Sequence, residues 1–149
     1  MLMEIPMKKE KWIKWEPVAK IPQTLLLDNI QYDCNNLSIS LYNPENRSQI
    51  LNIVFDGFLA FRSMDESKYS SWYDIEYDQV LTDMELEPNS LQKWSLFTVE
   101  NSRFVNWFLN QTGGVHDEDP IIHYLIVTPA DAVEILDIEG FDLPIVKWN

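Results

Sequence analysis

The chain has little cysteine and little glycine: Cys34 is its only thiol, and four glycines are spread over 149 residues. One cysteine cannot form an internal disulfide, and it offers no second thiol for a zinc site of the paired-cysteine kind. So few glycines leave little material for a phosphate-cradling loop, and no P-loop, GxGxxG or GxSxG pattern occurs. The sequence therefore predicts no catalytic residues and no cofactor, and it favours a reducing, cytoplasmic location.

Long hydrophobic runs are also missing. No apolar stretch approaches the roughly 18 residues of a membrane span. The first residues, MLMEIPMKKEKWIKWEP, place their lysines after the apolar residues, which is the reverse order of a secretory signal. A hydrophobic fraction of 46% and an aromatic fraction of 13% nevertheless predict a folded chain, and its length suits one domain spanning 1–149.

Positive charge is scarce in one half of the chain. Residues 1–64 hold seven acids and seven bases, whereas residues 65–142 hold seventeen acids against three bases. A surface of this sign repels phosphate backbones, so nucleic-acid binding is not expected, whereas a basic protein would be attracted. Solubility alone is the simpler interpretation of the same charge.

Alternating apolar residues predict a sheet in the first half. Residues 24–33 and 36–43 read as a hairpin, and the apolar run 50–62 reads as a third, central strand with a bulge or close backbone approach at Gly57. Together they predict an antiparallel meander from residue 23 to 62.

The second half mixes strands with helices. Residues 94–100 and 121–127 read as strands, with a helix between them that Asn101 or Ser102 caps. The spacing of Phe104, Trp107 and Phe108 places these three rings on one face of that helix. A second helix is predicted from Thr128, with Pro129 at its first position. A short edge strand, interrupted by Pro144, closes the chain. The predicted fold class is α+β, a mainly antiparallel sheet with two short helices packed on one face.

Both histidines lie in the stretch GGVHDEDPIIH, which raises the possibility of a small metal-dependent hydrolase centred on His116 and His123. The two are seven residues apart across Pro120, and two or three ligands on a loop make a weak site. The favoured interpretation places His116 in an acidic turn and His123 in the following strand, hydrogen-bonded to a neighbour. No metal site is predicted.

Acids and aromatics alternate in the irregular segment from Asp65 to Glu87. This mixture suits a basic protein partner, because aromatics supply rigid contact area and acids supply steering; the alternative is that the aromatics fill the core and the acids form a solvated face. The predicted partner-binding residues are Asp65, Glu66, Tyr69, Trp72, Tyr73, Asp74, Glu76, Asp78, Asp83, Glu85 and Glu87.

The order of the segments WEPVAKIPQTLLLDNIQYD, ILNIVFDGFLAFRSMDES, WSLFTVENSRFVNWFLNQTGG, IHYLIVTPADAVEIL and PIVKW resembles that of small, acidic, uncharacterised bacterial proteins. Some of these are suspected immunity proteins of polymorphic toxin systems. The resemblance implies a cytoplasmic, non-enzymatic protein that binds and blocks one cognate toxin, with no catalytic residue to carry over. Within the shared pattern, Glu100, Asn101 and Ser102 are interpreted as helix capping. Arg62, Asp65 and Glu66 are interpreted as a polar group that orders the start of the acidic connection, with Arg62 pairing to a carboxylate.

Overall fold

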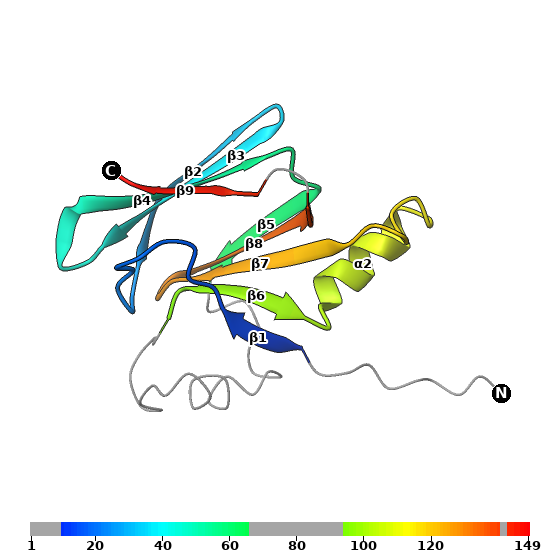
Figure 1. Ribbon diagram of the computed structural model, residues 1–149, viewed down its shortest axis with the longest axis horizontal. Coiled ribbons are helices and arrows are strands. Elements are labelled where there is room, and N and C mark those ends of the chain that lie inside the picture. The colour runs from blue at the N-terminus through cyan, green and yellow to red at the C-terminus, as the bar shows by residue number, and fades with distance from the viewer. Residues whose placement is uncertain (1–9, 66–93, 141–142) are drawn as a thin grey trace.

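Nine strands and one helix make up the part of the chain that the computed structural model describes, residues 10–65, 94–140 and 143–149. Sheet A contains five strands in the order β1-β6-β7-β8-β5, and sheet B contains four in the order β2-β3-β4-β9. All strand pairs are antiparallel. Figure 1 shows the two sheets as separate layers, with the helix α2 beside sheet A.

Sheet B begins with the predicted meander. Its strands are β2 (Leu26–Asp33), β3 (Asn36–Asn43) and β4 (Asn46–Asp56), and β9 (Ile145–Trp148) pairs with β4 at the far edge. Every second residue is buried from 37 to 41 in β3 and from 51 to 55 in β4, as expected for strands with one face on the core. The hairpin, the central place of β4 and a closing edge strand are confirmed. Pro144 does not interrupt this strand as predicted, because β9 starts directly after it.

The predicted third strand is too long, because the run 50–62 divides between the two sheets. β4 ends at Asp56, and β5 (Ala60–Asp65) pairs with β8 in sheet A. Gly57 lies in the connection with φ 78°, a conformation that glycine adopts without steric cost. It therefore marks the place where the chain leaves sheet B, and not a bulge within one strand.

Sheet A is assembled from β1 (Lys11–Lys14), β6 (Leu96–Glu100), β7 (Ile121–Val127), β8 (Asp131–Ile138) and β5. β6 and β7 are confirmed as strands, and β7 is buried on both faces as predicted. β1 was not predicted: it pairs with β6, and its Trp12 is buried.

The predicted second helix is wrong, because residues 131–138 form β8. Thr128 Oγ1 accepts hydrogen bonds from the N–H groups of Ala130 and Asp131, and Thr128 N–H donates to Asp131 O at 2.9 Å. These bonds close the β7–β8 turn, with Pro129 preset to the φ of its second position. A threonine followed by proline, which predicted the start of a helix, here forms the turn before a strand. The described residues therefore contain one helix where two were predicted.

The core lies between the inner faces of the two sheets. Leu37, Ile39, Leu51, Ile53 and Phe55 of sheet B pack against residues of sheet A. The sheet A side chains of this cluster are Leu96, Tyr124, Ile126, Val133 and Ile135. Full burial of each such side chain contributes about 1.5–3 kcal/mol.

The outer face of sheet A is apolar at both ends and polar between them. One apolar cluster surrounds Phe97, and another lies where Phe104 and Phe108 of α2 (Arg103–Gln111) pack on Leu136. α2 therefore covers β7 and β8, and it brings its own N-terminus above the polar residues in the middle of the sheet.

Candidate functional site

Ser102 fixes the start of α2 as its N-cap. Its Oγ accepts a hydrogen bond from Val105 N–H at 3.0 Å, and its backbone is extended at φ −70°, ψ 125°. This confirms the capping interpretation. The side chain is buried, and the same Oγ lies 2.6 Å from His123 Nδ1.

His123 lies in the middle of β7 with 1% of its surface exposed. Ser102 Oγ thus contacts both Val105 N–H, from which it accepts a hydrogen bond, and the His123 ring nitrogen Nδ1. Nε2 lies 3.0 Å from Glu134 Oε1 and makes no well-directed hydrogen bond within the described residues, so this contact is mainly electrostatic. The Phe104 ring meets the imidazole edge-on at 5.6 Å.

Glu134 is the buried acid of this arrangement. His123 stands opposite Leu136, so Glu134, two residues away along β8, is its diagonal neighbour on the same face. Glu134 stands directly opposite Arg62 on β5, and Arg62 Nε donates to its Oε2. Burial raises the pKa of Glu134, but the contacts with His123 and Arg62 outweigh burial and lower the pKa to about 2.

We call Ser102, His123, Glu134 and Arg62 the polar network. Within the described residues, the Glu134 carboxylate pairs with the Arg62 guanidinium, and such pairing is the condition for holding a charge in a protein interior. Glu10 stands near its margin and accepts a hydrogen bond from Arg103 N–H at 3.3 Å. Burial raises the pKa of Glu10, and this hydrogen bond opposes the rise.

A hydrolytic triad also consists of a serine, a histidine and an acid in contact. The geometry of the polar network differs from the geometry of such a triad. In such a triad the serine binds Nε2 and the acid orients Nδ1, whereas here the serine is at Nδ1 and the acid at Nε2. Ser102 is 6% exposed, and its oxygen is already engaged in capping. The arrangement therefore suits structural cross-linking of β5, β7, β8 and α2.

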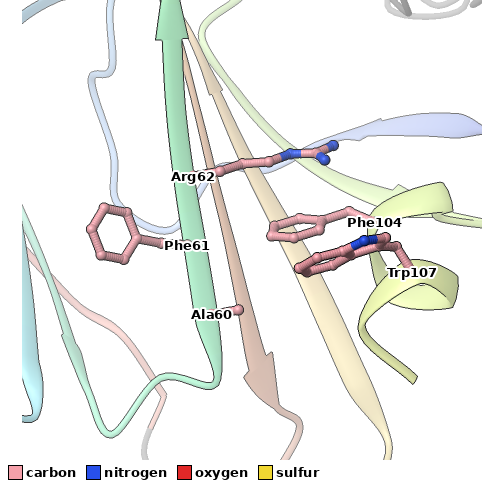
Figure 2. A pocket seen from close by; sticks show the side chains of 5 residues that line it. All are labelled: Ala60, Phe61, Arg62, Phe104 and Trp107. Carbon is pink, nitrogen blue, oxygen red and sulfur yellow. The ribbon is translucent and has the colours of Figure 1, made fainter. Parts of the chain in front are cut away.

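A pocket of about 240 Å³ lies beside the polar network, and we call it the β5 pocket. The described residues that line it are Ala60, Phe61, Arg62, Phe104 and Trp107. Figure 2 shows Arg62 extended toward Phe104 and Trp107, with Phe61 on the opposite side of β5. The guanidinium carbon of Arg62 lies 4.0 Å from the centroid of the Phe104 ring. Because Glu134 holds Arg62 and His123 supports Phe104, the polar network shapes the pocket wall.

Trp107 forms the outer wall of the β5 pocket. The helical periodicity predicts Trp107 on one face of α2 with Phe104 and Phe108, but only the two phenylalanines are buried, and Trp107 is 53% exposed. Its ring lies 5.9 Å from that of Phe104. An exposed tryptophan held against a buried ring is typical of an interface anchor.

Three further rings meet on the other side of β5. Tyr32 lies 5.6 Å from both Phe58 and Phe61, and these two lie 5.5 Å apart. We call these residues the aromatic edge cluster. Tyr32 is 61% exposed, and the exposed acids Asp33 and Asp56 flank Asn36 in one cross-strand row beside it.

Most of the predicted partner-binding segment lies outside the described residues. Asp65 is the exception: it is exposed at the end of β5, directly opposite Asp131. The other ten residues, Glu66, Tyr69, Trp72, Tyr73, Asp74, Glu76, Asp78, Asp83, Glu85 and Glu87, all fall within residues 66–93.

The two histidines have separate partners. His116 Nδ1 lies 2.7 Å from Asp119 Oδ2 in the turn after α2, whereas His123 contacts Ser102 and Glu134. The turn and strand interpretations are both confirmed. Within the described residues, no group of three or more His, Cys, Asp or Glu side chains is arranged to hold a metal ion.

Sequence reasoning missed Glu134, the aromatic edge cluster and the β5 pocket. A single acid inside the apolar run AVEIL was the available signal for Glu134, because a charge in a buried strand requires a partner. Arg62 was predicted to pair with a carboxylate at the start of the acidic connection, and among the described residues it pairs with Glu134 of β8.

Comparison of the chain with protein-family models, curated proteins and solved structures found no match. In the part of the chain that is described, no helix is long and apolar enough to cross a membrane.

Proposed function

We propose that this chain is a non-enzymatic, cytoplasmic binding protein, an inhibitor of the immunity type that neutralises a basic protein toxin. The aromatic edge cluster is the observation that carries the proposal. Tyr32 packs on two other rings and still leaves 61% of its surface exposed. Rigid aromatic groups of this kind dominate the binding energy of protein interfaces.

Charge supports a basic partner. Asp33 and Asp56 stand beside the aromatic edge cluster, and the chain carries a net charge of −13. Carboxylates around an apolar anchor raise the association rate with a basic protein and disfavour acidic competitors. The segment from Asp65 to Glu87 belongs to the proposed surface, which would occlude the cleft where the toxin binds its anionic substrate.

The polar network supports a non-enzymatic role. Its serine oxygen accepts a backbone N–H, its histidine is 1% exposed, and its acid is neutralised by Arg62. Each group thus has a structural task that a catalytic cycle would interrupt. A serine-reactive fluorophosphonate probe is expected to leave Ser102 unlabelled, and stoichiometric labelling would contradict this part of the proposal.

The test screens the proteins encoded next to this chain for a basic partner with toxin activity. Production of this partner alone is expected to stop cell growth, and co-production of the wild-type chain is expected to restore growth and yield a purified complex. Tyr32→Ala is expected to weaken the complex at least about tenfold, as loss of an interface anchor does. Val115→Ala is the matched control, because Val115 is 77% exposed and lies in the turn after α2. A toxin that neither binds nor is inhibited would overturn the proposal.

A further inference from the structure

The outer face of sheet B is open to solvent. β3 and β4 turn one set of alternate side chains to the core, so the other set points outward. Ile145 of β9 belongs to the outward set, because it stands opposite Val54, and it is 53% exposed. Figure 1 shows α2 beside sheet A, away from this face. A partner can therefore reach the outer face of sheet B directly.

The centre of this face has little to lose when it is covered. Ser40 Oγ donates a hydrogen bond to Asn52 Oδ1 at 2.7 Å, across the pair of β3 and β4. Polar groups that already bond to each other lose less on leaving water than groups left unpaired. The neighbouring outward side chains of β4, Ile50 and Val54, are apolar, and their burial favours association.

The outer face carries charges of both signs. β4 has Arg47 near its start and Asp56 at its end, and both are exposed. The guanidinium carbon of Arg47 lies 4.7 Å from the ring centroid of the outward Tyr42, and within the described residues neither charge of β4 forms an ion pair. Asp33 and Lys147 add one charge of each sign to the same face. Two copies of a chain with net charge −13 repel each other, so a face of mixed sign is where they can approach.

A two-fold rotation brings the opposite charges of β4 together. In a symmetric dimer a face meets itself, so residue i of one copy contacts residue j of the other while j contacts i. With the axis across the strands at Asn52, the two β4 strands run antiparallel, and Asp56 of each copy meets the region of Arg47 of the other. The same rotation sets Val54 against Ile50. Charged and apolar groups are thus both self-complementary.

The area of this face suffices for a weak dimer. Four strands about 4.8 Å apart, on average roughly eight residues long, cover about 500 Å². Two copies would bury about 1,000 Å², which is near the lower limit of a specific interface. The dimer should therefore form and dissociate with protein concentration.

We infer that the outer face of sheet B binds a second copy of this chain in a two-fold symmetric dimer, held at both ends by Asp56 of one copy and Arg47 of the other. The inference does not rest on the proposed function. Tyr32 stands opposite the inward Leu37, so it points to the other side of sheet B and stays accessible in the dimer. Asp56 borders both surfaces, so a second copy and a basic partner compete for it.

Sedimentation of the full chain at increasing concentration, without any partner, tests the dimer. Asp56→Arg and Arg47→Asp are each expected to weaken association at least about tenfold, because symmetry repeats the like-charge contact at both ends. The double variant is expected to recover the wild-type association, since it exchanges the two charges. Glu118→Arg is the matched control: it makes a charge reversal in the exposed turn after α2 and should not weaken the dimer. Each variant is checked first for wild-type thermal unfolding.

Cross-linking tests the same face without charge variants. In a Cys34→Ser background, a short bismaleimide is expected to join two Ser40→Cys chains, because Ser40 stands opposite Asn52 at the axis and meets its own copy. Val115→Cys chains, exposed in the turn after α2, should stay unlinked. The inference is overturned by a monomer at every concentration, by single reversals that dimerise like wild type, by a double variant that stays monomeric, or by equal cross-linking at positions 40 and 115.

Discussion

Replacing Glu134 by glutamine tests the polar network. The change keeps the shape of the side chain but removes the charge that faces Arg62 and His123. The pKa of Glu134 is about 2 against an ordinary value of 4.5, a difference that corresponds to on the order of 3 kcal/mol of folding free energy. Since the Arg62 side chain is 39% exposed, water partly compensates for the lost carboxylate, and we expect a loss of about 2–3 kcal/mol near neutral pH.

The stability difference between wild type and Glu134→Gln should depend on pH. A carboxyl with a lowered pKa in the folded state stabilises the fold above its unfolded pKa, and this contribution is lost as the pH falls through the folded value. The stability difference between wild type and Glu134→Gln should therefore shrink as the pH falls from about 4.5 toward 2, by about 1 kcal/mol already at about pH 3.5.

Urea unfolding followed by tryptophan fluorescence measures both the loss of folding free energy and its dependence on pH. Glu118→Gln is the matched control, because it makes the same chemical change on an exposed side chain of the turn after α2. A Glu134→Gln protein as stable as wild type, or a difference that does not depend on pH over this range, would refute the electrostatic account of the network.

Three further predictions concern single residues. Ser102→Ala should cost roughly 2–3 kcal/mol in urea unfolding, because α2 loses its cap and His123 Nδ1 loses its partner, whereas Ser102→Thr should retain most of the stability; equal losses would contradict the hydroxyl's role. Gly57→Ala should cost about 1 kcal/mol, since Gly57 has φ 78° and open space around it, so that a neutral substitution would exclude backbone strain there. Burial, and then the charges of Asp137 and Glu139, raise the pKa of Tyr124 to about 12. Its contribution to stability should be lost as the pH rises from about 10 toward 12, and the tyrosinate absorbance that Tyr124→Phe removes should appear near the upper value.

The sequence predicted the strands and the helix whose residue patterns are local. The alternation in 36–43 gave β3, and the aromatic spacing after Ser102 gave α2. Thr128 and Pro129 misled because a helix cap and a β-turn both use a threonine oxygen that accepts the N–H three residues on. β8 is buried on both faces, so it lacks the period of two that would have separated it from a helix.

The site was less predictable than the fold because its contacts are distant in sequence. Arg62 and Glu134 are 72 residues apart, and only the pairing of β5 with β8 brings them together. The aromatic edge cluster likewise joins β2 to the connection after β4 and to β5. A single sequence shows that Tyr32, Phe58 and Phe61 are aromatic, but it does not show that their rings meet.

The salt dependence of association with the basic toxin that this chain is proposed to neutralise tests the central claim most directly. An acidic surface that steers a basic partner should associate at least about tenfold faster at low than at high ionic strength, with little change in the dissociation rate. Stopped-flow tryptophan fluorescence measures both rates. An association rate that is the same at low and high ionic strength would contradict the proposal that carboxylates guide the partner to this surface.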